Sequence, residues 1–165
     1  MGVSDLVVTN VGVQSLAHPV LYLNPGLEVT ALTGEQGENL SYTRESQAIL
    51  LEKALQPGEE ILLHLVYEGK IDEAICFPDF TNEEFHDTRL MSFFQTYHSM
   101  FRHGRCFARV GDDYTLLFPE CLWYPVAVSP VNVSAPLARQ YDFTRYRLKV
   151  GDIGERVAIS QGEME

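Results

Sequence analysis

The chain has 165 residues, of which 45% are hydrophobic and 21% are charged, and its formal net charge is −11 at pH 7. These proportions are typical of one globular domain, whereas the negative charge argues against nucleic acid and anionic lipid as partners, because both attract a positively charged surface. No run of about 18 apolar residues occurs, so we expect a chain that is soluble in isolation and does not itself insert into a membrane.

The cysteines Cys76, Cys106 and Cys121 are too few for a disulfide scaffold, and their spacing is not that of metal ligands. The sequence is compatible with one disulfide and one remaining thiol. Three buried thiols are the favoured interpretation, because cysteine outside disulfides is among the most buried residue types.

The first part of the chain predicts short β-strands separated by turns. Residues 5–16 mix apolar and polar side chains, which favours an edge strand. Further apolar or alternating runs follow at 20–23, 27–33 and 40–43, with turn residues at 24–26 and 34–37 between them. Strands punctuated by turns every 8–12 residues or so are typical of a sandwich or an open barrel.

The stretch 47–76 predicts a long hairpin on which the other strands are organised. The segment Gln56-Pro57-Gly58-Glu59 has proline and glycine at the central positions of a type II turn. The run after this turn alternates with period two, which predicts a strand. The side chains expected to face the core are Ile61, Leu63, Leu65 and Tyr67.

One long helix is predicted at about 82–103, inserted between strands near Ala74 and Arg105. Thr81 and Glu84 fit a capping box, and Gly104 provides a C-terminal stop. Large apolar residues recur between them at steps of three and four. We expect the helix to pack the following side chains on a sheet: Phe93, Phe94, Tyr97 and Phe101.

Strands are predicted again after the helix. Residues 106–110 and 114–118 flank Gly111-Asp112-Asp113 and favour a hairpin, and 143–150 with 157–159 favour a last strand pair. The predicted fold is therefore an all-β antiparallel sandwich with one inserted long helix. It is expected to form a single domain over residues 1–165 and to be a fragment of a larger chain.

Several motifs resemble, in order, the N-terminal β-domain of zinc aminopeptidases of the aminopeptidase N type. The first is Leu63-x-Leu65-x-Tyr67-x-Gly69-x-Ile71, which is most similar to the form in bacterial membrane proteins that join transporter-permease segments to a peptidase region. The others are Leu23-Asn24-Pro25-Gly26-Leu27, Pro119-Glu120-x-x-Trp123-Tyr124-Pro125 and Phe143-x-x-Tyr146-x-Leu148-x-Val150.

The resemblance implies a non-catalytic domain that shapes one wall of a peptidase cleft and binds the remainder of its own polypeptide, the catalytic and membrane segments. It implies a parent protein anchored on the extracytoplasmic side of a bacterial membrane. The chain lacks the His-Glu-x-x-His zinc signature. We therefore expect no catalytic residue, metal or cofactor in this chain, with zinc held by the parent. The alternative is a free-standing β-sandwich module that binds a small ligand or a peptide.

Two further groups of residues are open to a chemical interpretation. An acidic group could hold a divalent cation, but acids also gather at a helix N-terminus because the helix dipole favours them. Its members are Asp79, Glu83, Glu84, His86 and Asp87. His64 lies in mid-strand, where a hydrogen-bonded sheet histidine is favoured over a catalytic base.

The interface candidates are Trp123, Tyr124, Pro125 and Tyr146. Aromatic side chains are common anchors of protein interfaces, and the flanking prolines would hold this segment rigidly. The alternative is that Trp123 fills one end of the hydrophobic core.

Overall fold

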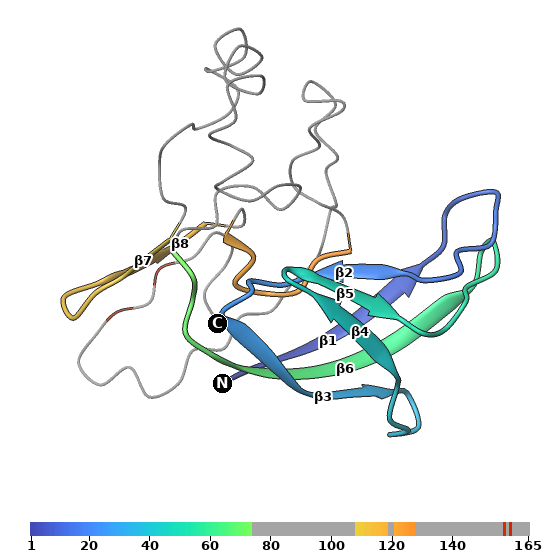
Figure 1. Cartoon of the computed structure of the whole chain (residues 1–165), viewed down its shortest axis with the longest axis horizontal. Coiled ribbons are helices and arrows are strands. Elements are labelled where there is room, and N and C mark those ends of the chain that lie inside the picture. The colour runs from blue at the N-terminus through green and yellow to red at the C-terminus, as the bar shows by residue number, and fades with distance from the viewer. Residues whose placement is uncertain (74–107, 119–120, 128–156, 158, 160–165) are drawn as a thin grey trace, which may run out of the picture.

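The computed structural model describes residues 1–73, 108–118, 121–127, 157 and 159 (Figure 1). These residues form antiparallel sheets and contain no helix. The first sheet has the order β1 (Gly2–Thr9), β6 (Glu60–Gly69), β3 (Leu27–Gly34). The second has the order β2 (Val20–Tyr22), β5 (Ala48–Leu51), β4 (Tyr42–Glu45), and a hairpin pairs β7 (Ala108–Val110) with β8 (Thr115–Leu117).

The two three-stranded sheets share one hydrophobic core. On β6 the side chains predicted to face inward are buried, whereas Leu62 is 42% exposed and Glu68 is exposed. The second sheet and its flanks supply the opposing side of the core. The buried cluster is Leu21, Leu23, Leu27, Leu32, Ile49, Leu51, Leu55, Ile61, Leu63, Leu65 and Tyr67. The predicted antiparallel β architecture is thus confirmed for the described residues, while the predicted helix at 82–103 and the strand pair 143–159 fall largely outside them.

The prediction of a long hairpin at 47–76 is wrong. Its turn forms as expected, since Glu59 N donates to Gln56 O at 2.9 Å and Gly58 has a φ of 76°. However, β5 pairs with β2 and β4, and β6 pairs with β1 and β3. The connection between β5 and β6 is too long for a tight hairpin. It carries the chain from one sheet to the other, so the two apolar faces meet across the core instead of lying side by side.

The expected edge strand at 5–16 is also shorter than predicted. β1 is an edge strand, but it ends at Thr9, because the side chain of Asn10 turns the chain away. Asn10 is 2% exposed. Its Nδ2 donates to Gln14 O at 2.8 Å and Leu55 O at 3.0 Å, while its Oδ1 accepts from Gly12 N at 3.0 Å. The loop that follows therefore holds Val11 and Val13 in solvent, 92% and 93% exposed.

The hairpin expected around Gly111 is confirmed. Ala108 lies opposite Leu117, and Gly111 N donates to Tyr114 O at 3.0 Å to close the turn. The Arg109 guanidinium stacks over the Tyr114 ring at 4.9 Å from its centroid. The tip carries Asp112 and Asp113 and projects away from the two sheets (Figure 1).

The burial of Tyr67 predicts that the stability of the fold depends on pH in the alkaline range. Tyr67 is 7% exposed, and burial raises the pKa of its phenol above 10.0, an effect that the contact with Ser4 Oγ at 3.4 Å opposes. Below pH 10 both folded and unfolded chains keep this phenol neutral. As the pH rises further, the unfolded chain ionises first, so this contribution to stability is lost.

We therefore expect Tyr67→Phe to change the free energy of unfolding by less than about 1.5 kcal/mol at pH 7. Above pH 10 the variant is expected to keep more of its stability than the wild type. Urea unfolding at pH 7 and at about pH 10.5 measures both values. The same loss of stability with pH in both proteins would contradict the assignment to Tyr67.

Candidate functional site

A buried asparagine joins three segments that are distant in the sequence. Asn24 is 0% exposed, and its Nδ2 donates to Asp72 O at 3.1 Å and to Cys121 O at 2.8 Å. Its Oδ1 accepts from Gly26 N at 3.0 Å and from Asp72 N at 2.8 Å. Both donors and both acceptor positions of the amide are therefore used. We call these four residues, together with Leu122, the Asn24 junction.

The backbone of Asn24 extends the same junction. Its N donates to Leu122 O at 2.9 Å, and its O accepts from Arg44 Nη2 at 3.0 Å. Arg44 Nη2 also donates to Leu23 O at 3.1 Å. Burial lowers the pKa of the Arg44 guanidinium, against an opposing effect of Tyr42. The arginine thus fixes the end of β2 by charge-assisted hydrogen bonds to carbonyl oxygens.

Two glycines allow the strands to approach closely beside this junction. Lys70 N donates to Gly26 O at 3.0 Å where the chain leaves β6. Gly69 has a φ of 138°, and a Cβ on it would overlap the Gly26 carbonyl oxygen. A Cβ on Gly26 would in turn overlap the Lys70 carbonyl oxygen. Any larger residue at either position would force these segments apart.

The segment with the interface candidates leaves directly from the junction. Leu122 and Pro125 are buried, whereas Trp123 and Tyr124 are half-buried and meet edge to face, with ring centroids 4.6 Å apart. Beyond them Val126 exchanges backbone hydrogen bonds of 2.8 and 3.0 Å with Tyr22 of β2. The two aromatic side chains therefore lie on a segment that is fixed at both ends. Tyr146 lies outside the described residues.

In this segment Cys121 and Leu122 are fully buried, each 0% exposed. The prediction of a buried thiol thus holds at Cys121, while Cys76 and Cys106 are not among the described residues. Leu122 has a φ of 55°, an uncommon conformation for a branched residue. The surrounding hydrogen bonds hold it there.

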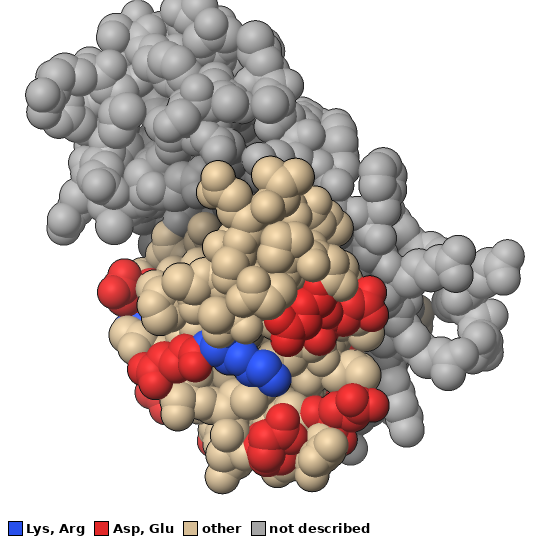
Figure 2. Space-filling view, turned by 90° about the vertical axis from the view of Figure 1, so that its right-hand side faces the viewer, with Lys and Arg blue, Asp and Glu red and all other residues tan. Residues whose placement is uncertain are grey.

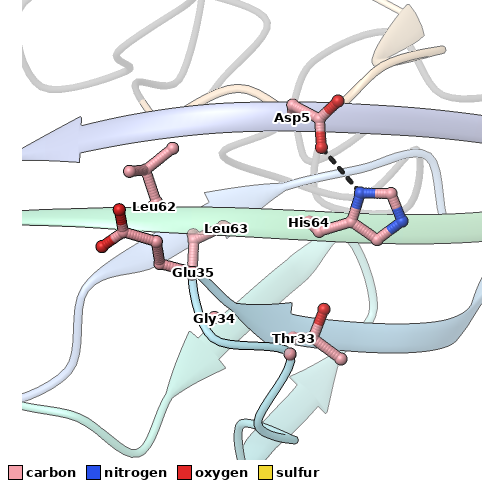
Figure 3. A pocket seen from close by; sticks show the side chains of 8 residues that line it. Asp5, Thr33, Gly34, Glu35, Leu62, Leu63 and His64 are labelled. Carbon is pink, nitrogen blue, oxygen red and sulfur yellow. Dashed lines mark hydrogen bonds and ion pairs between the residues drawn. The ribbon is translucent and has the colours of Figure 1, made fainter.

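His64 lies on the outer face of the first sheet, in an open depression of about 370 Å³. Its Nδ1 contacts Asp5 Oδ1 at 2.6 Å across β1 and β6 (Figure 3). The two side chains are 46% and 77% exposed. His64 is thus a hydrogen-bonded sheet histidine, and an exposed pair of this kind stabilises the fold only weakly.

Acidic side chains cover more of the described surface than basic ones on the face in Figure 2. Within the described ranges, no group of three or more histidine, cysteine, aspartate or glutamate side chains is placed to hold a metal ion. The acidic group at 79–87 lies outside them. The described part of the chain also has no helix of the length and hydropathy needed to cross a membrane.

Sequence reasoning missed the roles of Asn10 and Asn24. Asn24 was expected only to mark a turn. Its Oδ1 does accept a hydrogen bond from the backbone N of Gly26, two residues further along the chain. This is the local contact that asparagine typically makes in a turn. Nothing in the sequence connects it with Asp72 or Cys121, which lie 48 and 97 residues further along the chain.

Replacing Asn24 tests the junction. Asn24→Leu leaves the partner groups at Gly26, Asp72 and Cys121 buried without hydrogen bonds, each at about 1–3 kcal/mol, so we expect the free energy of unfolding to fall by more than about 3 kcal/mol. Asn39→Ala is the matched control, because Asn39 is exposed. Urea unfolding measures both, and similar losses in the two variants would contradict a structural role for the Asn24 amide.

Comparison with known proteins finds no matching family model, no matching curated protein and no matching solved structure. The resemblance to aminopeptidase N-type proteins therefore stays a prediction from the sequence motifs.

Proposed function

We propose that this chain is a non-catalytic β-sandwich domain that supports or shapes the peptidase cleft of an aminopeptidase N-type protein. The form proposed is the bacterial one linked to an ABC-transporter permease. In this proposal the domain binds the remainder of its own polypeptide on the extracytoplasmic side of a membrane. Zinc, where present, belongs to the catalytic part of the parent.

The main support is that three motifs of the resemblance meet at one place. Asn24 and Gly26 belong to the motif at 23–27, Gly69 to the motif at 63–71, and Cys121 lies within the motif at 119–125. The contacts of the Asn24 junction and of the two glycines join these motifs directly. Motif residues that depend on one another for packing are expected to occur together, which favours a common structural origin over three unrelated coincidences.

The second support is the placement of Trp123 and Tyr124. A half-buried aromatic pair on a segment anchored at Leu122 and Val126 loses little conformational entropy on binding. Such rigid aromatic side chains are suited to anchor a neighbouring domain. We assign Trp123 and Tyr124 to the surface that meets the rest of the polypeptide, whereas Pro125 is buried beneath it. Tyr146 stays an interface candidate on the resemblance alone, because it lies outside the described residues.

The alternative function is a free-standing module that binds a small ligand or a peptide. The depression beside Asp5 and His64 is the observation that favours it, although this depression is open, whereas small-molecule sites are usually enclosed. A rise in melting temperature with a small ligand, in the chain alone, would support the alternative.

We expect the purified chain to show no aminopeptidase turnover and no stoichiometric zinc, because it lacks the paired histidines and the glutamate of the zinc signature. Metal analysis and hydrolysis of an aminoacyl-p-nitroanilide measure these two properties. Turnover together with one zinc per chain would overturn the proposal.

We expect Trp123→Ala to leave the isolated chain folded and to weaken its docking to the catalytic part of the parent. The expected loss of domain affinity is at least about 30-fold, the effect of losing an interface anchor of 2 kcal/mol. Leu122→Ala is the matched control, because Leu122 is 0% exposed and its truncation costs about 2–5 kcal/mol of stability.

Thermal unfolding of the fragments and titration of one separately expressed part with the other measure these effects. If Trp123→Ala unfolds the isolated chain as Leu122→Ala does, Trp123 is a core residue and its assignment to the interface fails.

A further inference from the structure

Within the described residues, β1 lacks the protection that edge strands usually carry. It has eight residues, and its pairing with β6 runs without a register shift from Gly2 opposite Tyr67 to Thr9 opposite Glu60. Among the described strands it pairs with β6 alone. Its sequence has no proline, no lysine and no bulge, which are the features that normally prevent a further strand from pairing with an edge.

The other edges of the two three-stranded sheets are protected. β3, at the opposite edge of the same sheet, has a register shift between Val29 and Ala31 and an exposed Glu28. β2 and β4, the edges of the second sheet, are only three and four residues long. Short length and bulges both limit strand addition. The difference at β1 is therefore specific to that edge.

The exposed face of β1 has a definite chemical pattern. Val3 and Val7 are 51% and 61% exposed, and Asp5 lies between them on the same face. On β6 the neighbouring row carries exposed Glu60 and Glu68 at its two ends. A strand added to β1 would therefore have apolar side chains beside the two valines and a positively charged one beside Asp5.

We propose that the edge of β1 that is left unpaired by the described strands binds an extended peptide segment with the pattern apolar-x-basic-x-apolar, as an additional strand of the first sheet. Backbone hydrogen bonds supply affinity in this mode, and alternate side chains supply specificity. This inference is independent of the aminopeptidase relationship, since it rests on β1 and β6 alone.

A second copy of the chain is a poorer occupant of this edge. β1 contains no lysine or arginine, so no arrangement of two β1 strands places a cation beside Asp5. Each copy also carries a net charge of −11, which opposes association. Charge therefore favours a basic peptide segment.

The probe is the labelled peptide Thr-Val-Thr-Lys-Thr-Val-Thr, whose side-chain order is the same in both directions. We expect it to bind, measured by fluorescence anisotropy, and to slow amide exchange in β1. A peptide with glutamate in place of lysine is expected to bind about fivefold more weakly, because it places like charges side by side. A version methylated on alternate backbone nitrogens is expected not to bind.

Two variants of the protein locate the site. Val7→Lys is expected to weaken binding at least about tenfold, since lysine on an edge strand opposes strand addition and repels the basic peptide. Val13→Lys is the matched control, because it adds the same charge at an exposed loop position and should leave binding unchanged. Asp5→Asn is expected to remove the preference for lysine over glutamate.

The proposal is overturned if neither peptide binds, if the methylated peptide binds as well as the unmodified one, or if Val7→Lys and Val13→Lys bind equally. It is also overturned if sedimentation velocity shows a dimer of the chain that Val7→Lys dissociates, because a second copy then occupies the edge. Should Val7→Lys fail to fold, the peptide comparison and Asp5→Asn still decide the outcome.

Discussion

The described structure depends on one buried side chain, Asn24, whose amide has a partner at every hydrogen-bonding position. A buried amide without hydrogen-bond partners lowers the stability of the fold, whereas a fully paired one favours a single arrangement of the segments that supply its partners. Asn24 meets this condition only if the ends of β2 and β6 and the segment at Cys121 come together in one arrangement. Hydrophobic burial favours a compact chain, but this geometric requirement selects which segments meet.

The hydrophobic core imposes a complementary constraint. β5 and β6 each present an apolar row, with Ile49 and Leu51 on one and Leu63 and Leu65 on the other. Both rows are buried when the two strands belong to opposing sheets. Asn10 and Asn24 then fix connections into and out of these layers. Two buried asparagines thus add to the core the directional contacts that apolar packing lacks.

The functional proposals use different parts of this framework. The aromatic pair Trp123 and Tyr124 lies on a segment attached to the Asn24 junction. This attachment fixes the backbone that would present the two rings to a neighbouring domain. β1 lies at the edge of the first sheet, where its outward N–H and C=O groups could pair with an added strand and its exposed side chains include Val3, Asp5 and Val7. Asp5 contacts His64, so the charge of the edge is held in a defined place. Each surface can be altered separately by substitution.

The sequence alone determined the strand character, the turn at Gln56-Pro57-Gly58-Glu59, the inward row of β6 and the hairpin at Gly111, because period-two alternation and turn residues act over a few neighbouring positions. It also determined the exclusion of a zinc signature from this chain. The pairing of β1, β2 and β3 with later strands was decided by the tertiary structure, because these strands lie far from their partners in the sequence. The same holds for the contact of Asp5 with His64 and for the contacts of Asn24 with Asp72 and Cys121, which join residues 48 to 97 positions apart. Local patterns state which face of a strand is apolar, but not which other strand will cover it. The hairpin expected at 47–76 failed for this reason: its two runs are equally apolar, and the packing of two sheets placed them on opposite sides of the core.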